Sequence, residues 1–162
     1  MSTSSSNVVN ASSASLFIRK ARRKDRVGMK ECNERNLAEN YGLDFWEKSL
    51  DQYPGKSLVL TDKSHVIHGY IFGNGKMIIS FSVDKHLRRQ GLGRRLLETF
   101  LQDSAEGDVS LHVRASNDGA KKLYQSLGFT SKQKIPNYYQ SPQEDGELMV
   151  RSSACVLTEL AA

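Results

Sequence analysis

The sequence contains little cysteine and no long apolar segment. Its two cysteines, Cys32 and Cys155, have neither metal-ligand spacing nor a partner cluster, so we expect free thiols in a reducing compartment and no metal centre. No apolar run approaches the roughly 20 residues that a membrane-spanning helix needs. No signal peptide is visible, and residues 1–15 lack the arginines of a mitochondrial presequence. We therefore expect a cytoplasmic protein that binds neither a metal nor a membrane.

The chain is weakly basic, with a formal net charge of +5. Such a charge is compatible with a nucleic acid, a ribosome or an anionic cofactor as partner. Basic residues concentrate in segments 19–26 and 88–95. No aromatic residue interleaves with the first segment, which we interpret as a solvated helix start. The second coincides with a glycine-containing turn, so an anionic cofactor explains part of the charge and no direct nucleic-acid binding is expected.

One domain is predicted over residues 16–151, between a disordered Ser/Asn-rich tail (1–15) and a C-terminal tail (152–162). Periodicity and turn residues predict strands over 16–21, 57–61, 66–72, 76–83, 109–113, 129–133 and 147–150. Asp25 is expected to cap a first helix carrying Val27, Met29 and Cys32. Further helices are predicted over 43–50, 92–102 and 116–126. Asn74–Gly75 favours a type I′ hairpin. This order indicates an α/β fold with a mostly antiparallel sheet flanked by helices.

The most informative segment runs from Arg88 to Gly93. It follows an apolar strand and opens a helix, and it reads Arg-Arg-Gln-Gly-Leu-Gly. A helix N-terminus offers unpaired N–H groups and a positive dipole end, which suit a phosphate. Glycines allow close approach of the backbone, and arginines pair with phosphate oxygens. Read alone, the segment could equally be a surface loop that caps a helix.

A second element about 25 residues downstream makes the interpretation of the first one specific. The strand Leu-His-Val-Arg at 111–114 leads through Ser116 and Asn117 into a helix carrying Tyr124 and ending near Gly128. Together the two elements resemble the GNAT superfamily of acetyl-CoA-dependent N-acetyltransferases. Its pyrophosphate loop, Gln/Arg-x-x-Gly-x-Gly/Ala, is matched by Arg88, Gly91 and Gly93. The likeness extends over about residues 16–151 and implies the GNAT fold.

The resemblance implies acetyl-CoA as cofactor. The cofactor-binding residues that it implies are Phe81, Val83, Arg88, Arg89, Gln90, Gly91, Leu92, Gly93, Asn117 and Tyr124. Backbone amides over 90–93 would hold the pyrophosphate, and the Val83 amide would face the thioester oxygen. Asn117 also has an ordinary reading as a helix cap, and the two roles are compatible.

Three residues are candidates for catalysis: Tyr124, His112 and Glu39. Tyr124 lies on the apolar face of its helix, where packing alone would explain it, but the matching tyrosine of the family is a candidate general acid. His112 is either structural or a base, since its near-neutral pKa suits removal of a proton from an amine. The matching position is Glu in RimI-type enzymes and His in several eukaryotic amino-terminal acetyltransferases.

Two segments narrow the substrate. Residues 37–41, Leu-Ala-Glu-Asn-Tyr, resemble a peptide-site segment of the NatA catalytic subunit, in which proline stands at the position of Ala38. This likeness implies that Leu37, Glu39 and Tyr41 contact the substrate, with Glu39 acting as base or orienting the first residue. Tyr138 and Tyr139 resemble a pair that covers the peptide amino terminus in RimI-like and NatA-like enzymes. Each segment alone could be an ordinary polar loop or aromatic turn.

The leading hypothesis is transfer of acetyl from acetyl-CoA to the α-amine of a protein or peptide N-terminus, by direct attack in a ternary complex. One alternative is a GNAT enzyme acting on a lysine or a small-molecule amine, for which Glu39, Glu144 and Asp145 would supply an acidic pocket. Another is a non-catalytic acyl-CoA-binding module. An auxiliary subunit or the ribosome is a candidate partner beside the peptide substrate.

Overall fold

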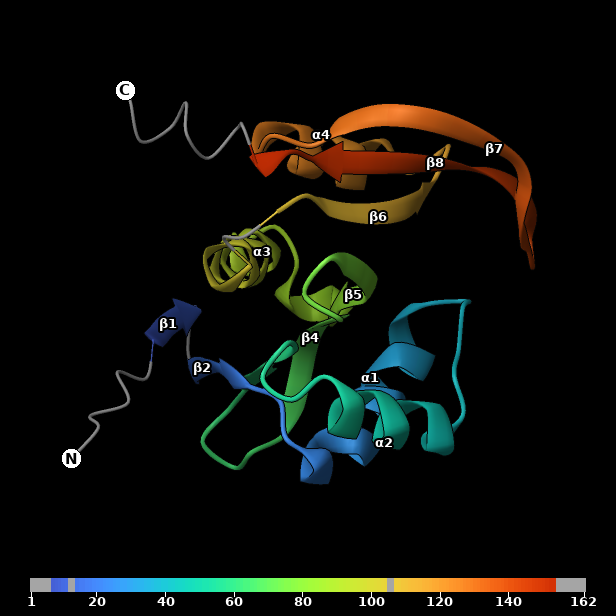
Figure 1. Ribbon diagram of the computed structural model, residues 1–162. Coiled ribbons are helices and arrows are strands. Elements are labelled where there is room, and N and C mark those ends of the chain that lie inside the picture. Colours follow the sequence, from blue (N-terminus) through green and yellow to red (C-terminus); the bar gives the residue numbers. More distant parts are fainter. Residues whose placement is uncertain (1–6, 12–13, 105–106, 154–162) are drawn as a thin grey trace.

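The computed structural model describes residues 7–11, 14–104 and 107–153, which form one sheet with helices on both faces (Figure 1). The eight strands are β1 (Asn7–Ala11), β2 (Ala14–Lys20), β3 (Leu58–Thr61), β4 (Ile67–Gly73), β5 (Met77–Val83), β6 (Val109–Arg114), β7 (Thr130–Gln140) and β8 (Gln143–Arg151). The helices are the 3-10 turns η1 (Arg23–Asp25) and η2 (Lys85–Leu87), and α1 (Arg26–Asn36), α2 (Leu43–Gln52), α3 (Leu92–Asp103) and α4 (Asp118–Ser126).

The sheet has the order β1-β2-β3-β4-β5-β6-β8-β7. Every neighbouring pair is antiparallel except β5 and β6, which run parallel and are joined through α3. A parallel pair needs such a crossover connection, because a tight turn reverses the chain. The α/β fold with a mixed, mostly antiparallel sheet is the one that the sequence predicts.

Two apolar cores lie on opposite faces of the sheet, because successive side chains of a strand point to opposite sides. In β3, Leu58 and Leu60 belong to one core, whereas Val59 belongs to the other. The first core packs α3 and Tyr124 of α4 against the sheet. The second packs α1 and α2 around the fully buried Trp46. The α-helices α3 and α4 therefore cover one face of the sheet, and α1 and α2 cover the other.

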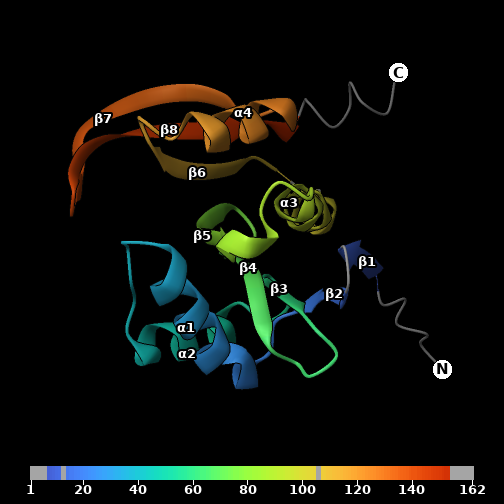
Figure 2. The same ribbon diagram turned by 180° about the vertical axis from the view of Figure 1, so that it is seen from behind.

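The pairing of β5 with β6 is short. It covers Met77↔Ser110 and Ile78↔Leu111 among the described residues. Both views agree that β6, β7, β8 and α4 form one group and that β2–β4 with α1 and α2 form another, with β5 between them (Figures 1 and 2). The two strands thus separate along the later residues of β5 and β6. The backbone N–H and C=O groups of the two strands do not pair with each other there.

Four local expectations need correction. The predicted disordered tail includes strand β1, Asn7–Ala11, which pairs antiparallel with β2. Its two adjacent β-branched valines favour extended backbone. Asp25 does stand at the N-cap of α1, but its carboxylate accepts the Arg22 N–H at 2.8 Å and pairs with Arg19, so it does not cap α1.

The turn at Asn74–Gly75 is not of type I′, since Gly75 has φ 90° whereas Asn74 is not in the positive-φ region that this turn requires at both positions. The Asn74 side chain builds the turn by accepting the Lys76 and Met77 N–H groups at 3.0 and 2.8 Å. Asparagine often closes turns in this way.

The predicted loop between the last two strands is a long hairpin. β7 continues through Tyr138 and Tyr139 to Gln140, and β8 begins at Gln143. The register shifts between Ile135 and Tyr139, where Asn137 adopts φ 52°. A bulge of this kind re-aims side chains without ending the strand, and a sequence of polar residues does not reveal it. The last predicted strands were therefore too short.

Cys32 is a buried free cysteine, as expected, whereas Cys155 and most of the C-terminal tail lie outside the described residues. No helix in the described part of the chain is both long and apolar enough to span a bilayer.

Candidate active site

A cavity of about 750 Å³ lies where β5 and β6 separate. Its walls come from four segments: the connection between α1 and α2, the middle of β5, the end of β6 and the β7–β8 hairpin. Nine of the residues predicted from the sequence line it: Leu37, Glu39, Tyr41, Phe81, His112, Asn117, Tyr124, Tyr138 and Tyr139. The other predicted residues, Val83 and those over 88–93, lie beyond its lining, at the end of β5 and the start of α3.

The turn before α3 has the backbone form that a phosphate site needs. Gly91 is the N-cap of α3 in the left-handed conformation (φ 76°), without a side-chain cap. A Cβ at Gly91 would meet no atom within 4 Å. Glycine is therefore favoured at position 91 by its positive φ and because a side chain would cover the backbone, not because a side chain would clash. The first N–H groups of α3 remain available to an anion.

Two further contacts tie this turn to β5. The Arg88 Nε donates to the Val83 carbonyl at 3.0 Å. A Cβ at Gly93 would lie 3.5 Å from the Phe81 ring. The phosphate-type turn and the split end of β5 therefore form one continuous surface, which is what a long cofactor with a phosphate at one end and a reactive group at the other requires.

Tyr124 of α4 is 8% exposed and packs near Phe81 and Phe129. Burial raises the pKa of its phenol, so the group is protonated at neutral pH and can donate a proton. Asn117, two turns earlier, caps α4 by accepting the Ala120 N–H at 3.2 Å. The capping role of Asn117 is thus confirmed, and the residue also lines the cavity.

His112 of β6 is partly buried, and its ring stacks on that of Tyr138 with centroids 4.6 Å apart. Burial lowers the pKa of His112 below its ordinary value of 6.5. The imidazole is therefore neutral at pH 7 and able to accept a proton. The stacking partner comes from β7, so the hairpin fixes the orientation of this ring.

Arg114 joins the two substrate segments, and the sequence analysis did not single it out. Its guanidinium pairs with Glu39 of the α1–α2 connection and donates to the carbonyls of Ser141 and Pro142 in the hairpin turn, at 3.2 and 2.8 Å. It also lies 4.3 Å above the ring of Tyr139. The signal was present in the alternation of β6, which places His112 and Arg114 on the same face.

The aromatic residues of the two substrate segments are ordered by stacking. Tyr41 lies parallel to Phe45 of α2 with centroids 4.4 Å apart, and Tyr138 meets Tyr139 edge-on at 4.9 Å. Burial raises the pKa of Tyr41, and burial with the nearby Glu39 carboxylate raises that of Tyr139. Both phenols therefore stay neutral and can hydrogen-bond a peptide backbone.

Comparison with known proteins identifies the family of this chain. The acetyltransferase (GNAT) domain family matches residues 16–138. The chain belongs to this family. It is an acetyl-CoA-dependent N-acetyltransferase. The catalytic subunit ard1 of the N-terminal acetyltransferase A complex of Schizosaccharomyces pombe is 32% identical over 148 residues, which cover 83% of this chain and 84% of that relative.

Two further relatives of this GNAT chain are informative. The Escherichia coli [ribosomal protein bS18]-alanine N-acetyltransferase is 43% identical over 72 residues, covering 43% of this chain and 47% of that enzyme. The crystal structure of Ard1 from Thermoplasma volcanium superposes with a TM-score of 0.77 at 29% identity, covering 85% of this chain and 97% of that one. The fold and the cofactor class predicted from the sequence are confirmed.

Proposed function

We propose that this GNAT enzyme transfers acetyl from acetyl-CoA to the α-amine of a protein or peptide N-terminus. The observation that carries the proposal is the Arg114 bridge, which closes the α1–α2 connection and the β7–β8 hairpin over one cavity. A cavity closed from two sides admits a chain end more easily than a mid-chain lysine. The similarity to the S. pombe catalytic subunit, which acts in an N-terminal acetyltransferase complex, supports the same choice.

The residues present fit acetyl-CoA. The exposed turn over 88–91 and the first amides of α3 would hold the pyrophosphate, with Arg88 and Arg89 adding charge. Phe81 and Val83 of the split strand would lie along the pantetheine arm, and Asn117 would bond the cofactor near the mouth of the cavity. Acetyl-CoA supplies an activated acetyl thioester. Holding it beside the amine supplies proximity, one of the largest contributions open to an enzyme.

His112 and Tyr124 divide the proton transfers between them. Neutral His112 takes a proton from the α-ammonium, directly or through a water, so that the nitrogen lone pair can form the new C–N bond. The buried Tyr124 phenol would give its proton to the thiolate that leaves when the thioester C–S bond breaks. Each group is in the protonation state that its role needs at pH 7.

Glu39 is assigned to positioning. Its carboxylate is already paired with Arg114, and Arg114 is in turn bonded to the hairpin turn, so the pair fixes where the carboxylate lies. We infer that Glu39 orients the first residues of the peptide together with Leu37, Tyr41, Tyr138 and Tyr139. An α-amine has a pKa near 8, against about 10.4 for lysine, so a histidine base suffices for it.

A polycationic small amine is the less favoured substrate. Of the three acidic residues near the cavity, Glu39 is neutralised by Arg114, and Glu144 accepts the Ser116 N–H at 2.7 Å with Arg114 at 3.6 Å. Asp145 accepts the Asn137 N–H at 2.9 Å. Of the three, Glu39 alone lines the cavity, and it is paired with Arg114, so the described lining offers a polyamine no unpaired carboxylate.

We place the enzyme in the cytoplasm, where the free Cys32 thiol would remain reduced. Since several relatives are catalytic subunits of larger complexes, an auxiliary subunit is a candidate partner.

The proposal is tested by incubating the protein with acetyl-CoA and a peptide library that varies the first two residues, with one internal lysine in every peptide. Mass-spectrometric mapping of the acetyl group locates the product. Acetyl on the α-amine supports the proposal, whereas acetyl confined to the lysine contradicts it.

A further inference from the structure

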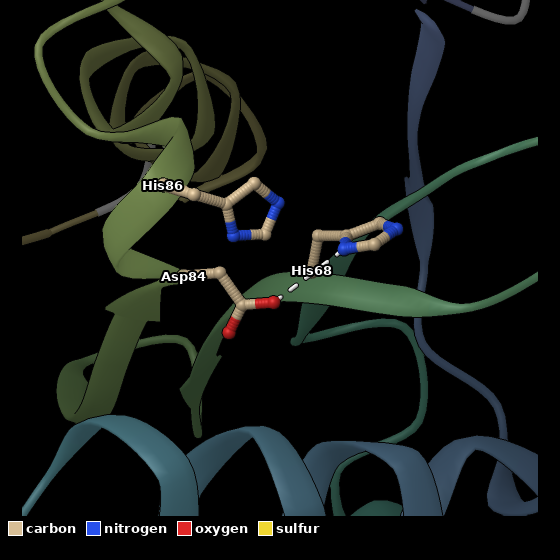
Figure 3. Close-up of side chains that lie close together, drawn as sticks. All are labelled: His68, Asp84 and His86. Carbon is tan, nitrogen blue, oxygen red and sulfur yellow. Dashed lines mark ion pairs between the residues drawn. The ribbon is translucent and has the colours of Figure 1, made fainter.

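Two imidazoles and a carboxylate converge outside the active-site cavity. His68 comes from β4, whereas Asp84 and His86 come from the segment that follows β5 (Figure 3). One ring nitrogen of each histidine and one Asp84 oxygen lie within 4.8 Å of one another. Asp84 is buried, His68 is partly buried and His86 is exposed. None of the three lines the cavity or has a role in the proposed reaction.

His68 is held in a defined orientation. Its Nε2 lies 2.9 Å from an oxygen of Asp62, whose other oxygen accepts the N–H groups of Ser64 and Val66 at 2.8 and 3.1 Å. With Asp62 accepting from Nε2–H, the lone pair of the neutral ring is at Nδ1. A carboxylate behind a histidine is the arrangement that orients and strengthens histidine ligands in metal sites.

The other nitrogen of His68 faces a second carboxylate. Nδ1 lies 3.4 Å from Asp84 Oδ2, and it is a buried atom without a hydrogen-bond partner in the part of the chain that the structure describes. Two lone pairs facing each other repel, so a cation or a proton is needed between them. Zinc ligands about 2.0–2.1 Å from the metal at tetrahedral corners are about 3.3–3.4 Å apart, which is the separation of these two atoms.

His86 can provide a third corner after a small side-chain shift, since its ring nitrogen lies within 4.8 Å of the other two ligand atoms. Its ring lies nearly perpendicular to that of His68, with centroids 5.9 Å apart, and it faces the other two side chains (Figure 3). Because His86 is exposed, a water can complete a four-coordinate site. Imidazole and carboxylate ligands together suit zinc.

The charges around Asp84 leave room for a cation. Its Oδ1 is used by Asn36 at 2.7 Å, and Arg35 Nη2 lies 3.2 Å from both oxygens. The Arg35 guanidinium pairs with Asp84, whereas Asp62 is paired with His68, so the two carboxylates are balanced by one arginine and a negative charge remains at the cluster. Arg35 also donates from Nε to Asp84 Oδ1 at 3.3 Å and from Nη2 to the Ile67 carbonyl at 3.1 Å, so it can keep these bonds when a metal takes Oδ2.

We propose that His68, Asp84 and His86 form a Zn²⁺ site, with Asp62 as the supporting carboxylate. The sequence analysis expected no metal, because it weighed the cysteines alone. Asp84 and His86 connect β5 to the turn that begins at Arg88. The ion therefore ties this connection to β4 and stabilises the start of the phosphate-binding turn, without taking part in acetyl transfer.

The test is calorimetric titration of Zn²⁺ into the untagged full chain after dialysis against a chelator. We expect one ion per chain and a higher midpoint of thermal unfolding. The variant His86→Asn should bind zinc at least tenfold more weakly. Its matched control is His65→Asn, since His65 is an exposed histidine at φ 64° in the turn between β3 and β4 and asparagine tolerates that angle. The control should bind as the parent does.

Asp62→Asn gives an independent readout, because the amide oxygen can still accept the Ser64 and Val66 N–H groups while the carboxylate behind His68 is lost. Its zinc affinity should fall by about 10–100-fold. The proposal is overturned if the parent takes up no zinc, and nitrogen NMR showing His68 as an imidazolium between its two carboxylates would then account for the 3.4 Å approach of Nδ1 to Asp84. Equal zinc affinity in the parent and His86→Asn would overturn it as well.

Discussion

Replacing Arg114 by alanine should weaken peptide use while leaving acetyl-CoA binding intact. The change removes donation to the Ser141 and Pro142 carbonyls, the ion pair with Glu39 and the contact with the Tyr139 ring. A hydrogen bond from a charged group contributes about 1.5–3 kcal/mol. The Glu39 side chain is 37% exposed, so solvent screening limits that pair to less than about 1 kcal/mol.

Because the two hydrogen bonds are solvent-exposed and hold the same hairpin turn, we count them as one, which predicts a fall in kcat/KM for a peptide of about 10–150-fold, since each 1.4 kcal/mol is a factor of ten. The assay is initial-rate kinetics at varied peptide concentration, with acetyl-CoA affinity and thermal midpoint measured in parallel. Arg23→Ala is the control, because Arg23 is a 59% exposed arginine paired with Asp51 at 2.8 Å. If Arg114→Ala keeps the parental peptide kinetics, the bridge does not shape the substrate site and our reasoning fails.

Three further predictions concern the cofactor turn and the proton transfers. Gly91→Asp should abolish acetyl-CoA binding in calorimetry, because a Cβ is strained at φ 76° and its carboxylate repels phosphate; normal affinity would remove the turn from the site. Tyr124→Phe should lower kcat by about 10²–10⁴-fold with nearly parental acetyl-CoA affinity, and an unchanged kcat would exclude the phenol as acid. In the parent, kcat should fall as the pH drops through the His112 pKa, below 6.5, because a protonated imidazole accepts no proton. His112→Ala should lose this inflection, and an identical profile in both would show that another group is the base.

The sequence predicted the parts of the site that local pattern encodes. The basic glycine turn and the Asn117 cap depend on residues only a few positions apart, so their neighbours in sequence are their neighbours in space. The pair between Glu39 and Arg114 spans 75 positions, and no periodicity in either segment specifies the other. It depends on how the sheet splits and on how the hairpin turns over it.

The β7–β8 hairpin was predicted incorrectly for the same reason, because its shape depends on residues that are distant in the sequence. Tyr138 and Tyr139 were expected in the loop between the last two predicted strands, on the strength of the family resemblance. The structure extends β7 through both by a bulge at Asn137, which needs the register of β8 to be known. The proposed Zn²⁺ site was not predicted for a related reason. His68 and Asp84 become neighbours through the pairing of β4 with β5, where the Asp84 N–H donates to the His68 carbonyl at 2.8 Å.

The central claim is that the accepted amine is the α-amine of a chain end. It is tested most directly with two peptides of one sequence, each with an internal lysine, one with a free amino terminus and one with that terminus already blocked. We predict rapid acetyl transfer to the free peptide and none to the blocked one. Equal rates on both peptides would contradict the claim and identify the lysine as the substrate.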